Sequence, residues 1–296
     1  MSIHNRRYKN DWLAYLFVSP AIIIFAVFVC WPIAQTVYLS FNSWNGIGSI
    51  TYVGLENYRA FFNDPIILRS VRNNLIWMLV VCSIPVSIGL VQASVLVNSR
   101  IRGSNYFQLI LFLPQVFSSV IVTVIWTWIY NPAMGPLNTT LRAIGLDTLA
   151  VPLLGRPDTV VGALLVMHVW MLYGFNTVVY SAAIRAIDTN LYEAATIDGC
   201  GMFRKFFNVT IPCLSRITTT LLLFAFIDSF RVFDIVFQMT RGGPGYSSHV
   251  LSFYLYSEAF IKDRIGYGAT IAVVFTVFLL LVTRVFLLLR EARENR

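Results

Sequence analysis

Three charged side chains stand close together inside an apolar stretch of the C-terminal half of the chain. Asp228, Arg231 and Asp234 are spaced at i, i+3 and i+6, which places them on one side of a predicted helix. Each charge at the centre of a bilayer costs about 2.5–3.5 kcal/mol on insertion scales, so we expect the three to pair and to face protein or water. They are typical either of a structural ion-pair network near the outer end of a span or of a polar pathway.

Uncharged polar residues form two further stripes in neighbouring apolar segments. The first consists of Gln115, Ser119, Thr123 and Trp126, and the second of His168, Tyr173 and Asn176, with Trp170 adjacent. Hydroxyls, amides and aromatic faces together suit a sugar, which needs planar hydrogen bonding and an apolar stacking surface. The same side chains also join membrane helices to one another, and a lone histidine more often does this than bind a ligand.

Sequence signatures of catalysis are absent. The chain has no G-x-x-x-x-G-K-[ST], no H-E-x-x-H and no G-x-S-x-G, and its four cysteines lack metal or disulfide spacing. We therefore expect no catalytic residue and no metal ligand. Energy for movement through a polar pathway would come from a partner ATPase, from an ion gradient, or from neither.

Composition identifies the elements that must position these residues. Of the 296 residues, 57% are hydrophobic and only 12% are charged, and the mean hydropathy is +0.70. Soluble domains carry about twice that charged fraction. Continuous apolar runs of about 20 residues are long enough to cross a bilayer, whereas a β-barrel shows alternating segments of about 10. The sequence therefore predicts an all-α polytopic membrane protein.

Six transmembrane helices are predicted, and lysine and arginine set their orientation. The spans are 13–37, 73–98, 106–130, 160–183, 213–237 and 267–289, flanked by termini 1–12 and 290–296, with an inner loop at 184–212. With the N-terminus inside, thirteen of the 22 basic residues lie on the inner side, including Arg100 and Arg102, eight lie on the outer side, and Arg231 lies within a span. Both termini are thus expected in the cytoplasm. The net charge of +8 reflects this topology, and no basic soluble face suggests nucleic-acid binding.

The inner loop is longer and more organised than a connection requires. Asp188, Thr189 and Asn190 are good N-caps for a helix at 191–198, and Gly199 suits the left-handed position that ends it. A second short helix is predicted at 202–207, with Met202, Phe203, Phe206 and Phe207 on one side. Pro212 fits near the start of the next span. The sequence predicts a helix–turn–helix across the cytoplasmic membrane face.

This loop is suited to docking. Ala194 and Ala195 let a partner surface approach closely, and Glu193 offers one charge for a specific pair. Exposed aromatic side chains can act as anchors in a pocket. The alternative is an interfacial amphipathic helix that lies on lipid.

The loop resembles the EAA loop of permease subunits of bacterial ABC importers. The resemblance rests on Glu193-Ala194-Ala195, Gly199 and the Ile-Pro at 211–212, within LYEAATIDGCGMFRKFFNVTIP. It is most similar to the sugar-importer permeases of the maltose and glycerol-phosphate class, and it extends over most of the chain. Further similar segments are 52–58 (YVGLENY), 113–114, 126–132, 232–234 and 241–244. Cys200 and Arg241 depart from the pattern, which more often has Ala and Gly there.

The resemblance implies a permease domain at 13–289 in a bacterial cytoplasmic (inner) membrane, with the loop as a coupling helix on an ATPase subunit. The implied coupling residues are Glu193, Ala194, Ala195, Asp198, Gly199, Phe203, Arg204 and Pro212. It also implies a second homologous permease, two ATPase subunits that bind ATP and Mg, and an extracytoplasmic solute-binding protein. This chain would hold no cofactor. The solute would be a carbohydrate or a similar polyhydroxy compound.

A second hypothesis is an ion-coupled secondary transporter or a channel that uses Asp228, Arg231 and Asp234 as its ion site. Such carriers usually show inverted repeats and broken helices, and no repeat is evident here. A membrane-embedded enzyme would need a catalytic cluster, which the sequence lacks.

Overall fold

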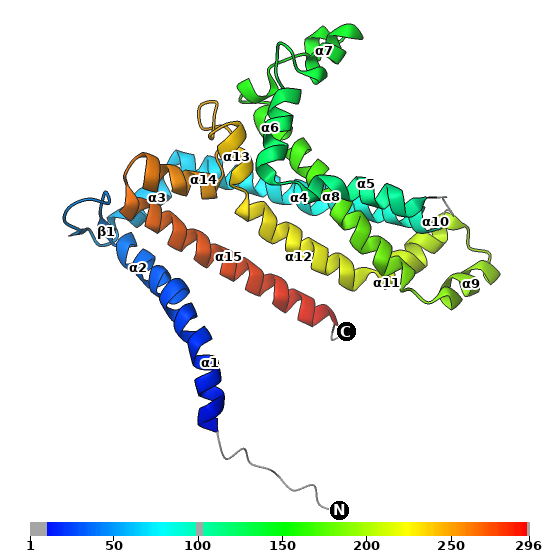
Figure 1. Cartoon of the computed structure of the whole chain (residues 1–296), viewed down its shortest axis with the longest axis horizontal. Helices are drawn as coiled ribbons and strands as arrows, with labels where there is room; N and C mark the ends of the chain where they lie inside the picture. Colours follow the sequence, from blue (N-terminus) through cyan, green and yellow to red (C-terminus); the bar gives the residue numbers. More distant parts are fainter. Residues whose placement is uncertain (1–10, 99–102, 295–296) are drawn as a thin grey trace, which may run out of the picture. The chain divides into compact units, whose positions relative to one another are not determined.

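The computed structural model describes residues 11–98 and 103–294 and is built almost entirely of helices (Figure 1). In chain order the elements are α1 (Asp11–Phe25), the π-helical turn η1 (Ala26–Cys30), α2 (Trp31–Ser40), β1 (Asn42–Ser43), β2 (Thr51–Tyr52), α3 (Glu56–Asn63), α4 (Pro65–Asn98), α5 (Ser104–Val116), α6 (Ser119–Ile129), α7 (Pro136–Ala143), the 3₁₀ turns η2 (Asp147–Leu149) and η3 (Leu153–Gly155), α8 (Val160–Arg185), α9 (Thr189–Ile197), α10 (Met202–Lys205), the π-helical turn η4 (Phe206–Thr210), α11 (Ile211–Cys213), α12 (Ser215–Arg231), α13 (Asp234–Met239), α14 (Leu251–Tyr256), the π-helical turn η5 (Ser257–Ile261) and α15 (Ile265–Glu294). The prediction of an all-α polytopic membrane protein is confirmed. The segment 1–10, Arg100, Arg102 and Arg296, on which part of the charge count rests, lie outside the described residues.

Four helical segments of the described chain are long and apolar enough to cross a membrane: Tyr15–Ser40, Pro65–Val97, Val160–Arg185 and Ile265–Val285. Two pairs of helices meet the same criteria only when each pair is taken together, and both pairs are bent. Ser104–Val116 and Ser119–Ile129 meet at 96°, and Met202–Cys213 and Ser215–Arg231 meet at 69°. The number of spans reaches six if each bent pair counts as one.

Two helices extend beyond the predicted spans. The second span was placed at 73–98, but α4 begins at Pro65, and the sixth was placed at 267–289, but α15 runs over Ile265–Glu294. Hydropathy marks only the part of a helix that lipid covers, whereas α4 and α15 continue as helix through polar residues. A 34-residue α4 is about 51 Å long, well beyond the hydrocarbon thickness of about 30 Å.

The third and fifth spans, predicted at 106–130 and 213–237, are both interrupted. α5 ends two residues after Pro114, and the extended backbone of Phe117 and Ser118 separates it from α6. Pro114 lacks the N–H that would bond the carbonyl four residues earlier, which weakens the helix at this point. α12 stops at Arg231, and Val232 and Phe233 separate it from α13.

Residues 65–254 form one compact unit whose centre is a group of packed helices. α4 packs along α8, α5 packs on α8, and α12 packs on α4 (Figure 1). The absence of a side chain at Gly174 lets α8 approach α5 closely, since a Cβ there would lie 1.8 Å from the carbonyl oxygen of Leu111. Tyr180 is fully buried in the core of this unit, and its hydroxyl donates to Thr218 Oγ1 at 3.0 Å.

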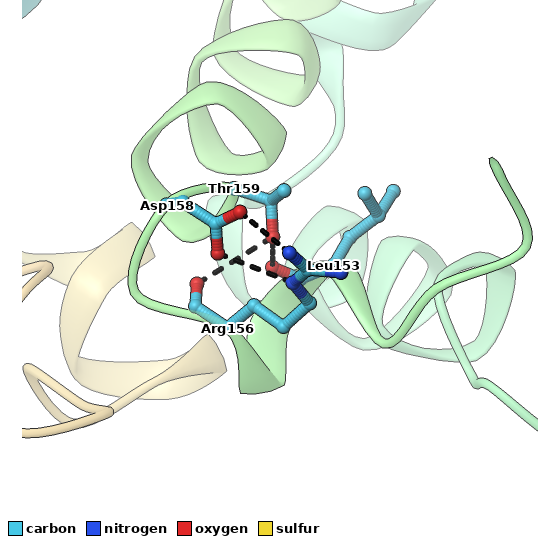
Figure 2. A network of polar contacts seen from close by, with 4 residues as sticks. All are labelled: Leu153, Arg156, Asp158 and Thr159. Carbon is cyan, nitrogen blue, oxygen red and sulfur yellow. Dashed lines mark hydrogen bonds and ion pairs between the residues drawn. The ribbon is translucent and has the colours of Figure 1, made fainter. Parts of the chain in front are cut away.

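The loop that leads into α8 is held by a local polar network (Figure 2). Two guanidinium nitrogens of Arg156 donate to the two carboxylate oxygens of Asp158, at 3.2 and 2.8 Å, and Thr159 Oγ1 donates to the carbonyl of Leu153 at 2.7 Å. The hydrogen bonds from Arg156 hold the pKa of Asp158 below its usual value. Both charged side chains are largely exposed, so the pair orders the loop more than it stabilises the fold.

Residues 11–64 and 255–294 belong to the second unit. In it α15 packs on α2 and α3, and β1 pairs antiparallel with β2, with Asn42 opposite Tyr52. A buried carboxylate, Glu258, is held by Lys262 at 2.6 Å and by Arg264 at 2.9 Å. The apolar side chains from Tyr15 to Tyr38 are largely exposed, as expected of a helix that meets lipid or another protein.

Gly174→Ala tests the contact between α5 and α8. We expect it to lower the free energy of unfolding by about 1–3 kcal/mol, because the new methyl group must push the two helices apart. Gly162→Ala on the same helix is the matched control, since its Cβ would meet no atom within 4 Å. The melting temperature of the detergent-purified protein checks this. An unchanged melting temperature for Gly174→Ala would contradict the observed packing.

Candidate functional site

The loop 188–212 folds as two short helices joined by a defined turn. Asp188 caps α9, because its Oδ1 accepts a hydrogen bond from the backbone N–H of Asn190 at 2.9 Å. The predicted cap is confirmed, although α9 spans Thr189–Ile197 where 191–198 was predicted. The difference is a shift of the helix toward its N-terminus.

The end of α9 is a Schellman motif. Gly199 has a φ of +73°, and its N–H bonds the carbonyl of Thr196 at 3.0 Å. The N–H of Cys200 bonds the carbonyl of Ala195 at 2.8 Å. These two bonds satisfy carbonyl groups that a helix end would otherwise leave unpaired. The predicted left-handed role of Gly199 is confirmed.

Side-chain contacts tie the second half of the loop to the first. Lys205 Nζ donates to Thr196 Oγ1 at 2.8 Å, and the hydroxyls of Tyr192 and Thr210 lie 2.9 Å apart. The helix predicted at 202–207 is α-helical only over Met202–Lys205 and continues as the π-helical turn η4. Pro212 follows in the first turn of α11, where it was expected. The loop is therefore a preformed unit.

Most of the predicted docking residues are exposed on this unit. Glu193, Ala194, Asp198, Gly199, Phe203, Arg204 and Pro212 are exposed, and Ala195 is half-buried. Of the four apolar residues predicted on one side, Met202, Phe203 and Phe207 are exposed and Phe206 is half-buried. Met202 and Phe206 both line a cavity of about 390 Å³. Ile197 was not predicted as a docking residue, yet its side chain is 87% exposed in the last turn of α9. The only sequence signal for this exposure is that Ile197 is an apolar residue directly before the polar Asp198.

The charged trio does not pair as predicted. Among the residues that the structure describes, no ion pair joins Arg231 to Asp228 or Asp234. The break after α12 removes Asp234 from the helix that carries the other two, so the i, i+6 spacing no longer applies. Asp234 Oδ2 instead accepts a hydrogen bond from Ser119 Oγ at 3.3 Å.

Asp228 faces His168 across the interface of α12 and α8. His168 Nε2 lies 3.1 Å from Asp228 Oδ2, an ion-pair distance that lacks the direction of a hydrogen bond. On the other side of the ring, Trp77 Nε1 donates to His168 Nδ1 at 2.8 Å. Trp77 was not among the predicted residues, because a tryptophan in an apolar run carries no signal of its hydrogen-bond partner.

A cavity of about 160 Å³ brings six of the predicted pathway residues together. Its lining includes Gln115, Ser119, His168, Asp228, Arg231 and Asp234. A second, more apolar cavity of about 270 Å³ shares Gln115, Leu172, Asp228 and Arg231 with it and also contacts Asn176. Residues from three predicted spans therefore converge on adjoining cavities rich in hydrogen-bonding groups.

The other predicted pathway residues lie elsewhere. The bend between α5 and α6 splits the first stripe, so that Thr123 bonds Gln238 Oε1 at 2.8 Å and lines a separate cavity of about 350 Å³. Trp126 packs against Trp170, with ring centroids 5.7 Å apart. Tyr173 is half-buried, and neither cavity around Asp228 includes it. The aromatic pair therefore does not provide a stacking surface in these two cavities.

This combination of several apolar helices, a polar cavity among them and a preformed polar loop defines a polytopic transport subunit. Residues 85–294 match the family described as "Binding-protein-dependent transport system inner membrane component". The chain belongs to this family and is a multi-pass inner-membrane component.

Individual relatives agree with this assignment. The chain is 35% identical to "Probable ABC transporter permease protein YurN" of Bacillus subtilis, over 92% of this chain and 94% of that one. It is 33% identical to "Diacetylchitobiose uptake system permease protein NgcF" of Streptomyces coelicolor, over 94% and 82%. A solved bacterial ABC transporter for import of the acidic polysaccharide alginate has the same fold, with a TM-score of 0.80 at 24% identity over 97% and 96% of the two chains.

Gly199→Ala tests the turn that ends α9. A side chain at a left-handed φ costs about 1–2 kcal/mol, so we expect the amide of Cys200 to exchange hydrogen about five- to thirtyfold faster. Gly201→Ala is the matched control, because Gly201 has an ordinary φ of −71° and open space around it. Hydrogen-exchange mass spectrometry of the membrane-embedded protein measures both. Equal exchange in the two variants would contradict the Schellman end.

Proposed function

We propose that this chain is one of two permease subunits of an ATP-driven importer, and that its loop 188–212 docks on a separate ATPase. The observation that carries the proposal is the exposed, capped two-helix loop in a member of this transport family. A preformed surface loses little conformational entropy when it binds, so it suits repeated docking better than a mobile tether does.

The chemistry of the loop fits a groove that is apolar at its centre and charged at its rim. Ile197 and Phe203 are 87% and 79% exposed and supply apolar anchors. Glu193 supplies the charge, and Ala194 leaves room for close approach. Anchors of this kind contribute most of the free energy in protein interfaces.

The remaining subunits follow from the same proposal. Two ATPase copies would bind ATP and Mg, because this sequence has no phosphate-binding loop and would hold no cofactor. A second homologous permease would complete the pathway, and the solute would arrive from an extracytoplasmic binding protein, as the family description implies. The loop and both termini would lie in the cytoplasm, where ATP is available.

Movement would come from a difference in docking contacts. ATP binding shifts the transporter between two states only if the loop interacts differently with the ATPase in each. The ties from Lys205 to Thr196 and from Tyr192 to Thr210 would transmit displacement of α9 to α11 and α12.

We propose a carbohydrate or a similar polyhydroxy compound as the solute. The cavity around Asp228, Arg231 and Gln115 offers a carboxylate, a guanidinium and an amide, which can bond hydroxyl groups as acceptors and donors. The name of the Streptomyces relative, a diacetylchitobiose uptake permease, supports this class.

The ion-coupled alternative receives less support. Asp228 faces His168, and Asp234 accepts a hydrogen bond from Ser119. The trio therefore does not form the compact ion site that the hypothesis requires. Family membership favours an ATP-driven complex.

Uptake energetics separate the two mechanisms. We expect membrane vesicles with the complete transporter and its binding protein to take up at least one member of a panel of diacetylchitobiose, lactose and sn-glycerol 3-phosphate. Depletion of ATP should stop uptake, and collapse of the proton gradient at constant ATP should not. Uptake that persists without ATP and stops with the gradient would support the ion-coupled alternative.

Glu193→Lys combined with Ala195→Trp tests docking. The reversed charge at the exposed Glu193 and the added bulk at the half-buried Ala195 should reduce ATP-dependent uptake at least tenfold. Membrane insertion should stay intact, because α9 lies outside the apolar segments that are long enough to cross a membrane. Asp147→Lys, a charge reversal at an exposed site in the loop before α8, is the control and should transport normally. A well-inserted double variant with wild-type uptake would rule out this docking surface.

A further inference from the structure

A series of polar side-chain contacts joins three helices of the 65–254 unit beside the cavity of about 160 Å³. Trp77 on α4 donates from Nε1 to Nδ1 of His168 on α8 at 2.8 Å, and His168 Nε2 lies 3.1 Å from Oδ2 of Asp228 on α12. Trp77 is 0% exposed and His168 is 6% exposed. Polar groups buried this deeply depend on each other as hydrogen-bond partners.

The contact with Trp77 fixes the proton on the histidine ring. An indole N–H can only donate, so Nδ1 of His168 must accept and cannot carry a proton. In the neutral ring the proton therefore lies on Nε2, the nitrogen that faces Asp228. Trp77 thus determines that the ring presents an N–H, and not a lone pair, to the carboxylate.

Asp228 is held from one side and open on the other. Its Oδ2 is buried, yet 47% of the side chain is exposed, so the exposed part lies elsewhere on the side chain. Asp228 lines both adjoining cavities together with Arg231. Asp228 therefore has one carboxylate oxygen in contact with the His168 ring, and its side chain also lines the cavities.

We propose that Trp77 and His168 are positioning residues that orient Asp228 to accept hydrogen bonds from hydroxyl groups of the solute. This inference rests on the proposed function, since it assigns a role within the same cavity. Simple attachment of α4 to α8 would need only the bond between Trp77 and His168. The continuation of this series of contacts to a half-exposed carboxylate at the cavity wall is what points to positioning.

Orientation matters because Asp228 has a competing partner. Arg231 lies one turn away on α12 and lines the same cavities, but it does not pair with Asp228 in the described structure. If the Asp228 carboxylate could rotate toward the Arg231 guanidinium, the two would pair. The oxygen lone pairs would then no longer be available to accept hydrogen bonds from a hydroxyl ligand. The close contact of Oδ2 with Nε2 of His168, at 3.1 Å, opposes this rotation.

The first test needs no solute. Nitrogen-15 NMR of the histidine-labelled wild-type protein in membranes distinguishes protonated from unprotonated ring nitrogens, and comparison with His168→Gln assigns the signal among the three histidines. We expect His168 Nε2 to be protonated and Nδ1 unprotonated, and Trp77→Phe to give a mixture of tautomers. Protonated Nδ1 in the wild type would overturn the proposal.

The second test asks whether Trp77 acts through Asp228. In the complete transporter, Trp77→Phe should raise the half-saturating concentration of diacetylchitobiose, or of another transported sugar of the panel, about three- to tenfold, with little change in maximal rate. Asp228→Asn should raise it as well, and the double variant should show no further rise, because the shared target is already lost. Trp31→Phe, at an exposed tryptophan of α2, is the matched control.

The outcomes separate the two proposals. An additive effect of Trp77→Phe in the Asp228→Asn background, or an unchanged half-saturating concentration in Trp77→Phe alone, would overturn the positioning role while the importer function stands. A wild-type transporter that moves no sugar would overturn the proposed solute class, and with it the role of Asp228 in binding a hydroxyl.

Discussion

The structure depends on one constraint: a polar group within the hydrocarbon region must find its partner in protein or in an enclosed aqueous space. The interruption after α12 shows how this constraint acts. The carbonyl of Val232 accepts a hydrogen bond from Ser252 Oγ, and the carbonyl of Ser229 accepts one from Asn74 at 3.3 Å. Irregular backbone is stable here because other elements satisfy it. The same interruption and the bend at α5–α6 both border the cavity of the charged residues, so broken helices and buried charges occur together.

The loop 188–212 depends on local contacts, in contrast to the long packed helices of the same unit. Its helices are too short to be stable alone, so they rely on the Asp188 cap, the Gly199 end and contacts between the two halves. These contacts leave apolar side chains such as Ile197 exposed. Clusters of exposed apolar side chains are uncommon on soluble proteins unless they bind a partner. The same unit thus contains an ordered loop with exposed apolar surface and a polar cavity. These two features are expected of a transport subunit in which movement of a docked partner changes access to the cavity.

The sequence predicts local features well and tertiary ones poorly. Capping at Asp188 and the left-handed Gly199 depend only on neighbouring residues, and both are present. No glycine or proline marks the break at Val232. Contacts from Ser252 and other distant residues stabilise it, so the local sequence does not predict it. The pairing of Asp228 with His168 was missed for the same reason, since helical spacing identified a charged neighbour on the same helix and could not identify one on α8.

Site-specific photocrosslinking from α9 tests the central claim, that this loop meets the ATPase, most directly. A photoreactive amino acid at Ile197, an exposed position of α9, would be irradiated in membranes with the complete transporter. We expect a covalent adduct with the ATPase subunit whose yield changes when ATP is added, and no ATPase adduct from the same probe at Asp147. Adducts with lipid alone, or an ATPase adduct of equal yield from Asp147, would contradict it.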